Sequence, residues 1–189
     1  METPKKLIIA ITGASGAVYG KSLLQNISGR PGLFEEVAVI FSENGRKVWA
    51  YELGKEAIVP AGFREFSNED SFAAPASGSA GYTHMVICPC SMATLGSIAG
   101  GISTNLILRA ADVMLKERRT LVLVPREMPY SLIHIRNMET VTLAGGIICP
   151  ASPSFYALPA TQEEIIQSVT EKICNLIHPD TNGYRWGSR

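Results

Sequence analysis

Five short apolar segments alternate along the chain with longer amphipathic segments, and this alternation restricts the possible folds more than any other feature. The apolar segments end at turn or polar residues, which is typical of strands buried on both faces of a sheet. They cover residues 6–11, 36–41, 85–88, 120–124 and 146–149. The amphipathic segments cover residues 17–27, 43–53, 92–99, 106–116, 131–144 and 162–177. Strand–helix alternation predicts an α/β fold with a doubly wound, mostly parallel sheet flanked by helices.

Length and composition favour a single domain, residues 1–189, with a sizeable core. Of the 189 residues, 46% are hydrophobic and 18% are charged. Seventeen Lys and Arg residues balance 17 Asp and Glu residues, so net charge attracts neither nucleic acid nor an anionic membrane. The apolar run at residues 7–11 is too short for a signal-peptide core or a membrane span. We therefore expect a cytoplasmic protein with no nucleic-acid or membrane partner.

Ligands of such a sheet bind beyond the carboxyl ends of its strands, and the segment after the first strand is unusual there. Residues 12–17 are small, with Gly13, Ala14 and Ser15 in the middle, which lets an anion approach backbone N–H groups at a helix start. Ser15 replaces the middle glycine of the dinucleotide fingerprint and the first glycine of a Walker loop. The segment predicts anion or nucleotide binding without favouring NAD or ATP hydrolysis.

Three further segments follow strands or lie on helices, and each could have either a structural or a functional role. Ser91 either caps a helix or contacts a ligand. Arg109, Asp112 and Lys116 share one helical face and form either a solvated ladder or part of a site. Arg126 and Glu127 stand between two prolines at the end of the fourth strand, which favours a functional position. Residues 60–81 and 150–159 are expected to be functional loops.

The sequence offers little for metal or hydrolase chemistry. The three histidines are His84, His134 and His178, and they form no close cluster with carboxylates, so we expect no metal. Ser15 lacks the Gly-x-Ser-x-Gly context of a hydrolase nucleophile. The four cysteines do not have the spacing of a disulfide framework or zinc knuckle and are expected to be buried, reduced thiols.

Taken together, these motifs resemble those of the UbiX-type flavin prenyltransferases, within the wider superfamily of FMN-binding flavoproteins. The resemblance covers nearly the whole chain, including residues 155–156 and 185–187, and its motifs are residues 11–17, 88–91, 109–112, 115–119 and 124–127. It implies a Rossmann-like or flavodoxin-like fold, reduced FMN as prenyl acceptor and dimethylallyl phosphate as donor, without a metal. The product would be prenylated FMN for a UbiD-type decarboxylase. Relatives complete each site with neighbouring chains, so the resemblance also implies a homo-oligomer, a dodecamer.

The resemblance assigns roles to individual residues. Catalytic roles would fall to Ser15 and Glu52, near the flavin N5, and to Lys116 and Glu127. FMN would be held by Gly13, Ala14, Ser15, Ser42, Ser91, Met92, Ala93, Thr94 and Arg126. The donor would be bound by Arg109, Lys116, Glu127, Tyr156, Lys172 and Trp186, with a contribution from Ser77 and Ser79. The last helix and tail, about residues 162–189, would close the site.

Lys172 departs from the family pattern, because many relatives have arginine at this position. A lysine presents a point charge where arginine presents a bidentate fork, which puts the donor preference in question. Two other readings remain. An FMN-dependent decarboxylase of the phosphopantothenoylcysteine decarboxylase type would need a Pro-x-Met-Asn-x-x-Met-Trp motif, which the sequence lacks. A non-catalytic flavin-binding module would use the Gly13–Gly16 turn but would not need Lys116 and Glu127.

Overall fold

The computed structural model describes residues 5–178, and their strands form one parallel sheet in the order β3-β2-β1-β4-β5-β6. The strands are β1 (Lys6–Ile11), β2 (Glu36–Phe41), β3 (Arg64–Ser67), β4 (His84–Cys90), β5 (Thr120–Pro125) and β6 (Ile147–Ile148). This strand order is that of the doubly wound Rossmann type. The predicted fold class is confirmed, and the order distinguishes the Rossmann arrangement from the flavodoxin one.

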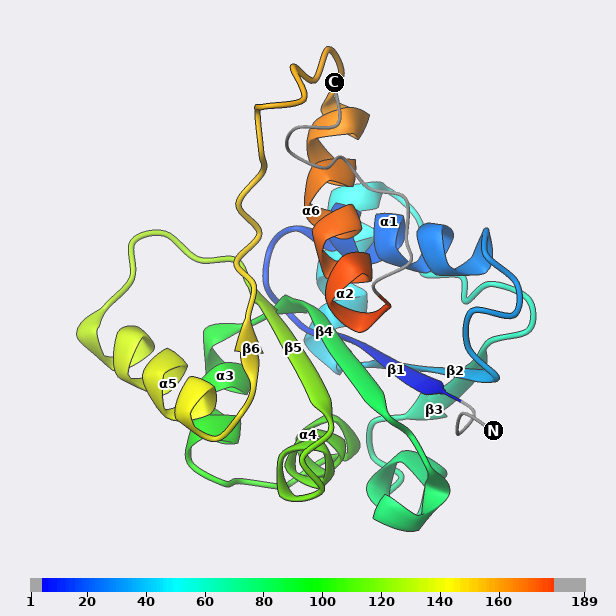
Figure 1. Cartoon of the computed structure of the whole chain (residues 1–189), viewed down its shortest axis with the longest axis vertical. Helices are drawn as coiled ribbons and strands as arrows, with labels where there is room; N and C mark the ends of the chain where they lie inside the picture. The colour runs from blue at the N-terminus through cyan, green and yellow to red at the C-terminus, as the bar shows by residue number, and fades with distance from the viewer. Residues whose placement is uncertain (1–4, 179–189) are drawn as a thin grey trace.

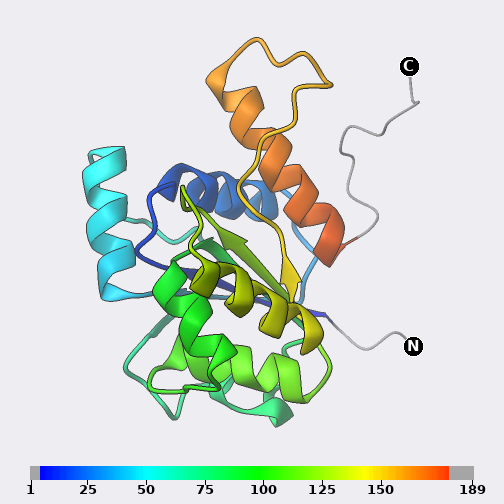
Figure 2. The same cartoon turned by 90° about the vertical axis from the view of Figure 1, so that its left-hand side faces the viewer.

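Helices cover both faces of the sheet (Figures 1 and 2). One face packs against α1 (Ala17–Ser28), α2 (Glu43–Leu53) and α6 (Gln162–Ile177). The opposite face packs against α3 (Met92–Ala99), α4 (Leu106–Lys116) and α5 (Leu132–Leu143). Two short 3₁₀ helices, η1 (Ala74–Ala76) and η2 (Gly78–Ala80), lie beside α4. No helix in the described part of the chain is long and apolar enough to cross a membrane.

The central strands are buried on both faces, as their continuous apolar sequences predict. In β1, Leu7, Ile9 and Ile11 pack with the α1 side of the core. Ile8 and Ala10 pack with the α4 side. All five side chains are fully buried, which explains why the strand shows no polar alternation.

Strand β3 was not predicted, because its sequence does not have the apolar pattern of a buried strand. It lies within the segment 60–81 that we expected to be a loop, and it pairs with β2 at the edge of the sheet. Three of its four residues are exposed, and only Phe66 faces the core. An edge strand needs just one apolar contact to pack, so its hydrophobic signal is weak.

Helix α6 packs against α1 through a stripe of apolar side chains. Ile166, Val169, Ile173 and Ile177 are buried. Thr170, which the apolar pattern did not indicate, is also buried, with its hydroxyl 3.0 Å from that of Ser22. Of the segment of about 162–189 that we expected to close the site, residues 179–189, including Trp186, lie outside the described residues.

The cysteines are free thiols, as expected. Cys88, Cys90 and Cys174 are buried and Cys149 is half-buried. Burial raises the pKa of Cys90 to about 12, so this thiol is protonated at neutral pH.

Candidate active site

The carboxyl ends of β1, β2 and β4 meet at the point where the order of the strands reverses, which is where ligands of this architecture bind. Thr12 connects two of these ends. It is almost fully buried, its hydroxyl donates to the Pro89 carbonyl at 2.9 Å, and it accepts from the Ser91 N–H at 2.8 Å. The Ser42 N–H donates to the Ile11 carbonyl at 3.0 Å. Backbone and hydroxyl bonds therefore hold three of the predicted ligand-binding segments together.

Small residues at this edge are required by close approaches of the backbone. A Cβ atom on Gly13 would lie 2.7 Å from Cβ of Asn44, and one on Gly45 would lie 2.3 Å from the Ile11 carbonyl oxygen. Gly16 has φ of 112°, in the left-handed region that favours glycine. The start of α2 can therefore approach the end of β1 only because Gly13 and Gly45 have no side chains.

Glu52 accepts hydrogen bonds from the backbone N–H groups at the start of α1. Its carboxylate accepts from the Gly16 N–H at 2.9 and 3.1 Å and from the Ala17 N–H at 2.8 Å. We expected this turn to bind an external anion, but two of its N–H groups donate instead to a carboxylate of the same chain. This geometry places Glu52 beside Ser15, whereas the sequence separates them by 37 residues.

The ionisation of Glu52 follows from these contacts. Burial pushes the pKa of this carboxyl up, but hydrogen bonds from Ser15, Gly16 and Ala17 and the charge of Arg126 outweigh burial. The pKa of Glu52 therefore lies below its usual range, and the side chain is a carboxylate at neutral pH.

Arg126 joins the end of β5 to the same turn. Its Nε donates to the Ser15 carbonyl at 2.9 Å. The adjacent Glu127 is exposed, and its Oε1 accepts from the Met128 N–H at 3.0 Å. A guanidinium, two carboxylates and a serine are thus gathered at one edge of the sheet, so the site combines fixed positive charge with groups able to exchange protons.

Hydroxyl side chains line the neighbouring part of this edge. A cavity of about 210 Å³ lies between Thr12, Ser42, Thr94 and the start of α4 at Asn105. Ser42 and Ser91 are helix caps, because their hydroxyls accept from the N–H groups of Gly45 and Thr94. The interpretation of Ser91 as a helix cap is therefore correct. Its hydroxyl also lies 3.0 Å from the hydroxyl of Thr94, which lines the cavity. The contributions of Thr12 and Asn105 were not predicted, although Asn105 precedes a helix as caps do.

A second and larger cavity, of about 720 Å³, lies between α6 and the segment after β6. Lys172 lines it and is exposed, outside the buried stripe of α6. Tyr156 is on the same segment and is 70% exposed. The Ala151 N–H donates to the Pro125 carbonyl at 3.1 Å, which ties this segment to the residues preceding Arg126.

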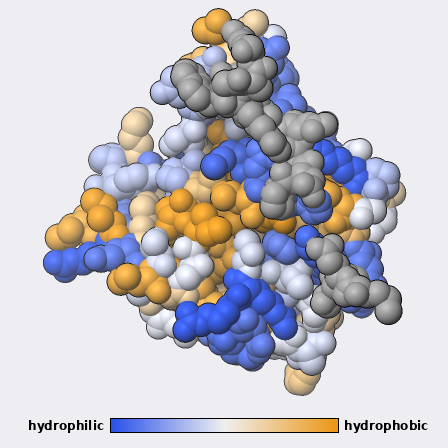
Figure 3. All heavy atoms as spheres, in the orientation of Figure 1, coloured by the Kyte–Doolittle hydropathy of each residue, from blue (hydrophilic) through white to orange (hydrophobic). Residues whose placement is uncertain are grey.

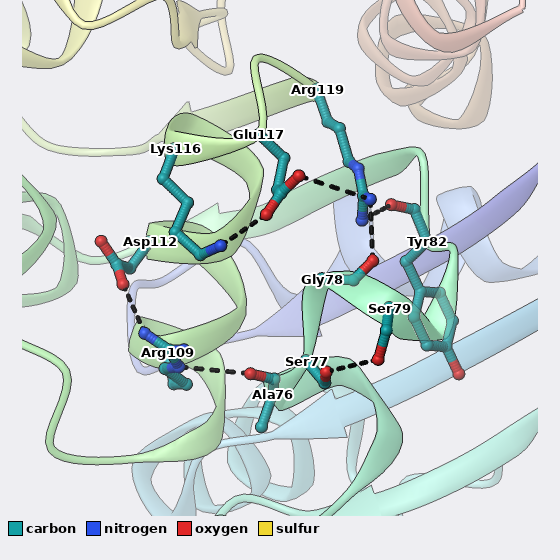
Figure 4. Close-up of polar contacts among 10 residues, drawn as sticks. All are labelled: Ala76, Ser77, Gly78, Ser79, Tyr82, Arg109, Asp112, Lys116, Glu117 and Arg119. Atoms are coloured by element: carbon teal, nitrogen blue, oxygen red, sulfur yellow. Dashed lines mark hydrogen bonds and ion pairs between the residues drawn. The ribbon is translucent and has the colours of Figure 1, made fainter.

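Arg109 and Lys116 lie elsewhere on the chain, and Arg109 contacts Ala76, which directly precedes Ser77 (Figure 4). Arg109 donates to Asp112 at 2.7 Å and to the Ala76 carbonyl at 3.2 Å. Lys116 pairs with Glu117 at 2.5 Å, so the ladder predicted from Arg109 through Asp112 to Lys116 forms only in its first half.

Lys116 lies at the edge of the sheet formed by the amino ends of the strands, whereas Ser15 lies at the edge formed by their carboxyl ends. It ends α4, four residues before β5 begins, whereas Ser15 follows the end of β1. Each of these strands has six residues, and at ~3.3 Å per residue the two edges are about 20 Å apart. Within one chain, the cations expected to bind the donor are therefore divided between two places. Among the described residues there is no cluster of His, Cys, Asp and Glu that could hold a metal ion.

Comparison with known proteins gives the chain a family. The Flavoprotein family model matches residues 1–178. The flavin prenyltransferase UbiX of Pseudomonas aeruginosa is 41% identical over 206 residues, covering 100% of this chain and 97% of the relative. The enzyme of the same name from Methanocaldococcus jannaschii is 39% identical over 186 residues, covering 97% and 99%.

Solved structures agree with these relatives. The structure of AnUbiX (PadA1) in complex with FMN and dimethylallyl pyrophosphate has a TM-score of 0.83 at 36% identity, covering 97% of this chain and 100% of that one. A dodecameric FMN-dependent UbiX-like decarboxylase from Escherichia coli O157:H7 has a TM-score of 0.87 at 36% identity, covering 95% and 99%. A PPC decarboxylase, 17% identical with a TM-score of 0.62, shares the fold alone. The chain therefore belongs to the flavoprotein family and, within it, to the UbiX-type flavin prenyltransferases.

Proposed function

We propose that this chain transfers the dimethylallyl group of dimethylallyl phosphate to N5 and C6 of reduced FMN, giving prenylated FMN. The observation that carries the proposal is the joining of Glu52 and Arg126 on the Ser15–Ala17 turn, with Glu127 adjacent. When bound, reduced FMN supplies the nucleophilic atoms N5 and C6. Phosphate leaves from the allylic carbon with the bonding electron pair.

The carboxyl edge of the sheet, where the carboxyl ends of its strands lie, fits FMN as a ligand. Gly13 and Gly45 have no side chains where α2 approaches the turn. The cavity beside the turn is lined by Thr12, Ser42 and Thr94. Hydroxyl groups donate to and accept from a ring and a ribityl chain, and a guanidinium binds phosphate. We assign FMN to Gly13, Ala14, Ser15, Ser42, Ser91, Met92, Ala93, Thr94 and Arg126.

Glu52 and Glu127 would carry the acid–base chemistry. Glu52 is held as a carboxylate against the turn, with Ser15 beside it, which suits a group that orients N5 and its proton. Glu127 is exposed beside Arg126, which suits a carboxylate that takes up the proton released from C6. Positive side chains, rather than a metal, would stabilise the departing phosphate.

We further propose that each site is shared between chains. Lys116 lies about 20 Å from Ser15 along the sheet, with Arg109 on the same helix, so a single small donor cannot contact both Ser15 and Lys116 of one chain. A neighbouring copy can supply these two cations to the carboxyl edge, where Tyr156 and Lys172 would complete the donor site. The dodecameric state of a relative supports such an assembly. The cytoplasmic location expected from the sequence stays a prediction.

Exposed apolar side chains on and before α5 also favour assembly. Met128, Leu132, Ile133, Ile135 and Leu143 are each at least half exposed. Figure 3 shows hydrophobic residues gathered over the part of the surface where Figure 1 places α5. Contiguous exposed apolar surface of this kind is typical of a protein–protein contact.

The proposal commits to the monophosphate as donor and to a UbiD-type decarboxylase as recipient of the product. The relative's structure holds the pyrophosphate, so both donors belong in the test. Purified protein is incubated anaerobically with reduced FMN and either donor, and the extracted flavin is analysed by mass spectrometry. Flavin heavier by one dimethylallyl group, formed faster from the monophosphate, supports the proposal. Unchanged flavin with both donors refutes it and leaves a flavin-binding module or an FMN-dependent decarboxylase.

A further inference from the structure

Arg119 anchors the segment beside the end of α4. Its guanidinium donates to the Tyr82 carbonyl at 2.9 Å and to the Gly78 carbonyl at 2.8 Å. The side chain is only 21% exposed, so these bonds are partly shielded from water. Because both acceptors are backbone atoms of the segment that carries η2, the position of the Arg119 charge is fixed by the fold.

Glu117 lies between this fixed guanidinium and Lys116 (Figure 4). One carboxylate oxygen is 2.5 Å from the Lys116 ammonium, and the other is 3.9 Å from the Arg119 guanidinium. A Cβ atom on Gly78 would lie 2.7 Å from the Glu117 Oε1, so this glycine leaves the room that the carboxylate needs. The hydrogen bond from Lys116 lowers the pKa of Glu117, which therefore stays charged at neutral pH.

A lysine that binds a small phosphate benefits from being held in advance. Its ammonium is on a flexible four-carbon stem, and fixing such a stem on binding costs conformational entropy. The ammonium has three N–H donors, so a bond to Glu117 leaves two for a phosphate. Glu117 thus need not be displaced when the donor arrives.

The Arg109 side chain is held in the same manner, by Asp112 and by the Ala76 carbonyl. Two of the cations assigned to the donor, Arg109 and Lys116, therefore have a carboxylate partner from their own chain. As surface ion pairs, such contacts contribute little to folding stability. Their value to the protein would be in the placement of charge rather than in holding the fold together.

We propose that Glu117 and Arg119 are positioning residues that set the Lys116 ammonium for the donor phosphate, Arg119 through Glu117 and Glu117 through direct contact. This inference rests on the function proposed above. It adds two residues on the amino edge of the sheet to the donor site, neither of which touches the donor. Their effect should therefore vanish once Lys116 itself is removed.

The test measures donor binding rather than turnover. The FMN-loaded, full-length oligomer is titrated with dimethylallyl phosphate by calorimetry, with oxidised flavin so that no transfer occurs. The variants are Glu117→Gln, Arg119→Gln, Lys116→Met and the double variant Glu117→Gln with Lys116→Met. Glu35→Gln is the matched control, because Glu35 is an exposed carboxylate outside the donor site.

We expect Glu117→Gln to weaken donor binding about tenfold, a coupling typical of charged residues in contact. Arg119→Gln should weaken it as well, with FMN affinity unchanged in both, and Glu35→Gln should match wild type. The double variant should bind the donor no more weakly than Lys116→Met alone. Donor affinity equal to wild type in Glu117→Gln, or losses that multiply in the double variant, would overturn the inference. An equal loss of FMN affinity would do the same, since it would indicate general structural damage. Wild-type protein that binds no donor would refute the proposed function itself, and the inference would fall with it.

Discussion

Glu52→Gln tests the assignment of Glu52 most severely, because the structure gives both a size and a pH dependence for its effect. The carboxylate accepts hydrogen bonds from the N–H groups of Gly16 and Ala17 at the positive end of α1. A bond to a charged group contributes about 1.5–3 kcal/mol when shielded from water. Glu52 is exposed, so solvent reduces the total to about 1–2 kcal/mol.

The expected loss in thermal midpoint is roughly 2–8 °C for a chain of this length. The loss must also depend on pH. Because the pKa of Glu52 is lower in the folded protein than its ordinary 4.5, the carboxylate stabilises the fold at higher pH. This stabilisation is fully present well above pH 4.5 and is lost as the pH falls through the folded pKa.

Urea unfolding of wild type and Glu52→Gln, at neutral pH and at several pH values below 4.5, measures the difference directly. Glu56→Gln is a suitable control, since Glu56 is an exposed carboxylate four residues away. The free-energy difference between wild type and Glu52→Gln should shrink as the pH falls. Equal stability at neutral pH, or a difference independent of pH, would show that the carboxylate is not bound to the turn.

Three further predictions follow from the site and the fold. Glu127→Gln should keep FMN affinity and slow prenyl transfer by about 10²–10⁴-fold, because an amide cannot exchange the proton; single-turnover kinetics measure this, and unchanged rates would remove Glu127 from the mechanism. Lys172→Met should raise the donor KM about tenfold and Lys172→Arg should keep or improve activity, as expected for a charge-assisted bond to phosphate; equal donor kinetics for wild type and Lys172→Met would make Lys172 an ordinary surface lysine. Gly45→Ala should destabilise the fold by about 1–3 kcal/mol, because its Cβ would lie 2.3 Å from the Ile11 carbonyl oxygen; urea unfolding checks this, and wild-type stability would mean that the two segments separate easily.

The sheet could be predicted because most of its strands are continuously apolar and buried on both faces. The ranges 6–11 and 36–41 coincide with β1 and β2. Strand β3 could not be predicted, since only Phe66 packs on the core. Strand β6 is also shorter than the apolar run around it, because only two of its residues pair with β5.

The candidate site could be predicted in parts but not in its assembly. Small residues after β1 and charged residues after β5 were evident, since ligand sites follow strand ends. The hydrogen bonds from the N–H groups of Gly16 and Ala17 to Glu52 could not be predicted, because no local sequence pattern connects a residue of α2 to the start of α1. The distance between Lys116 and Ser15 follows from the topology of the fold alone. Motifs listed in sequence order do not reveal that topology.

Subunit mixing tests the central claim, that one prenyl-transfer site uses both edges of the sheet from different chains. Lys116→Met and Glu127→Gln are each expected to make little prenylated FMN as pure oligomers. Co-expressed in one cell, they should form mixed oligomers in which some sites combine an intact Lys116 from one chain with an intact Glu127 from another. Mass spectrometry of the extracted flavin should then show prenylated FMN well above the level of either pure variant. Mixed oligomers with no more product than the pure variants would contradict the shared site.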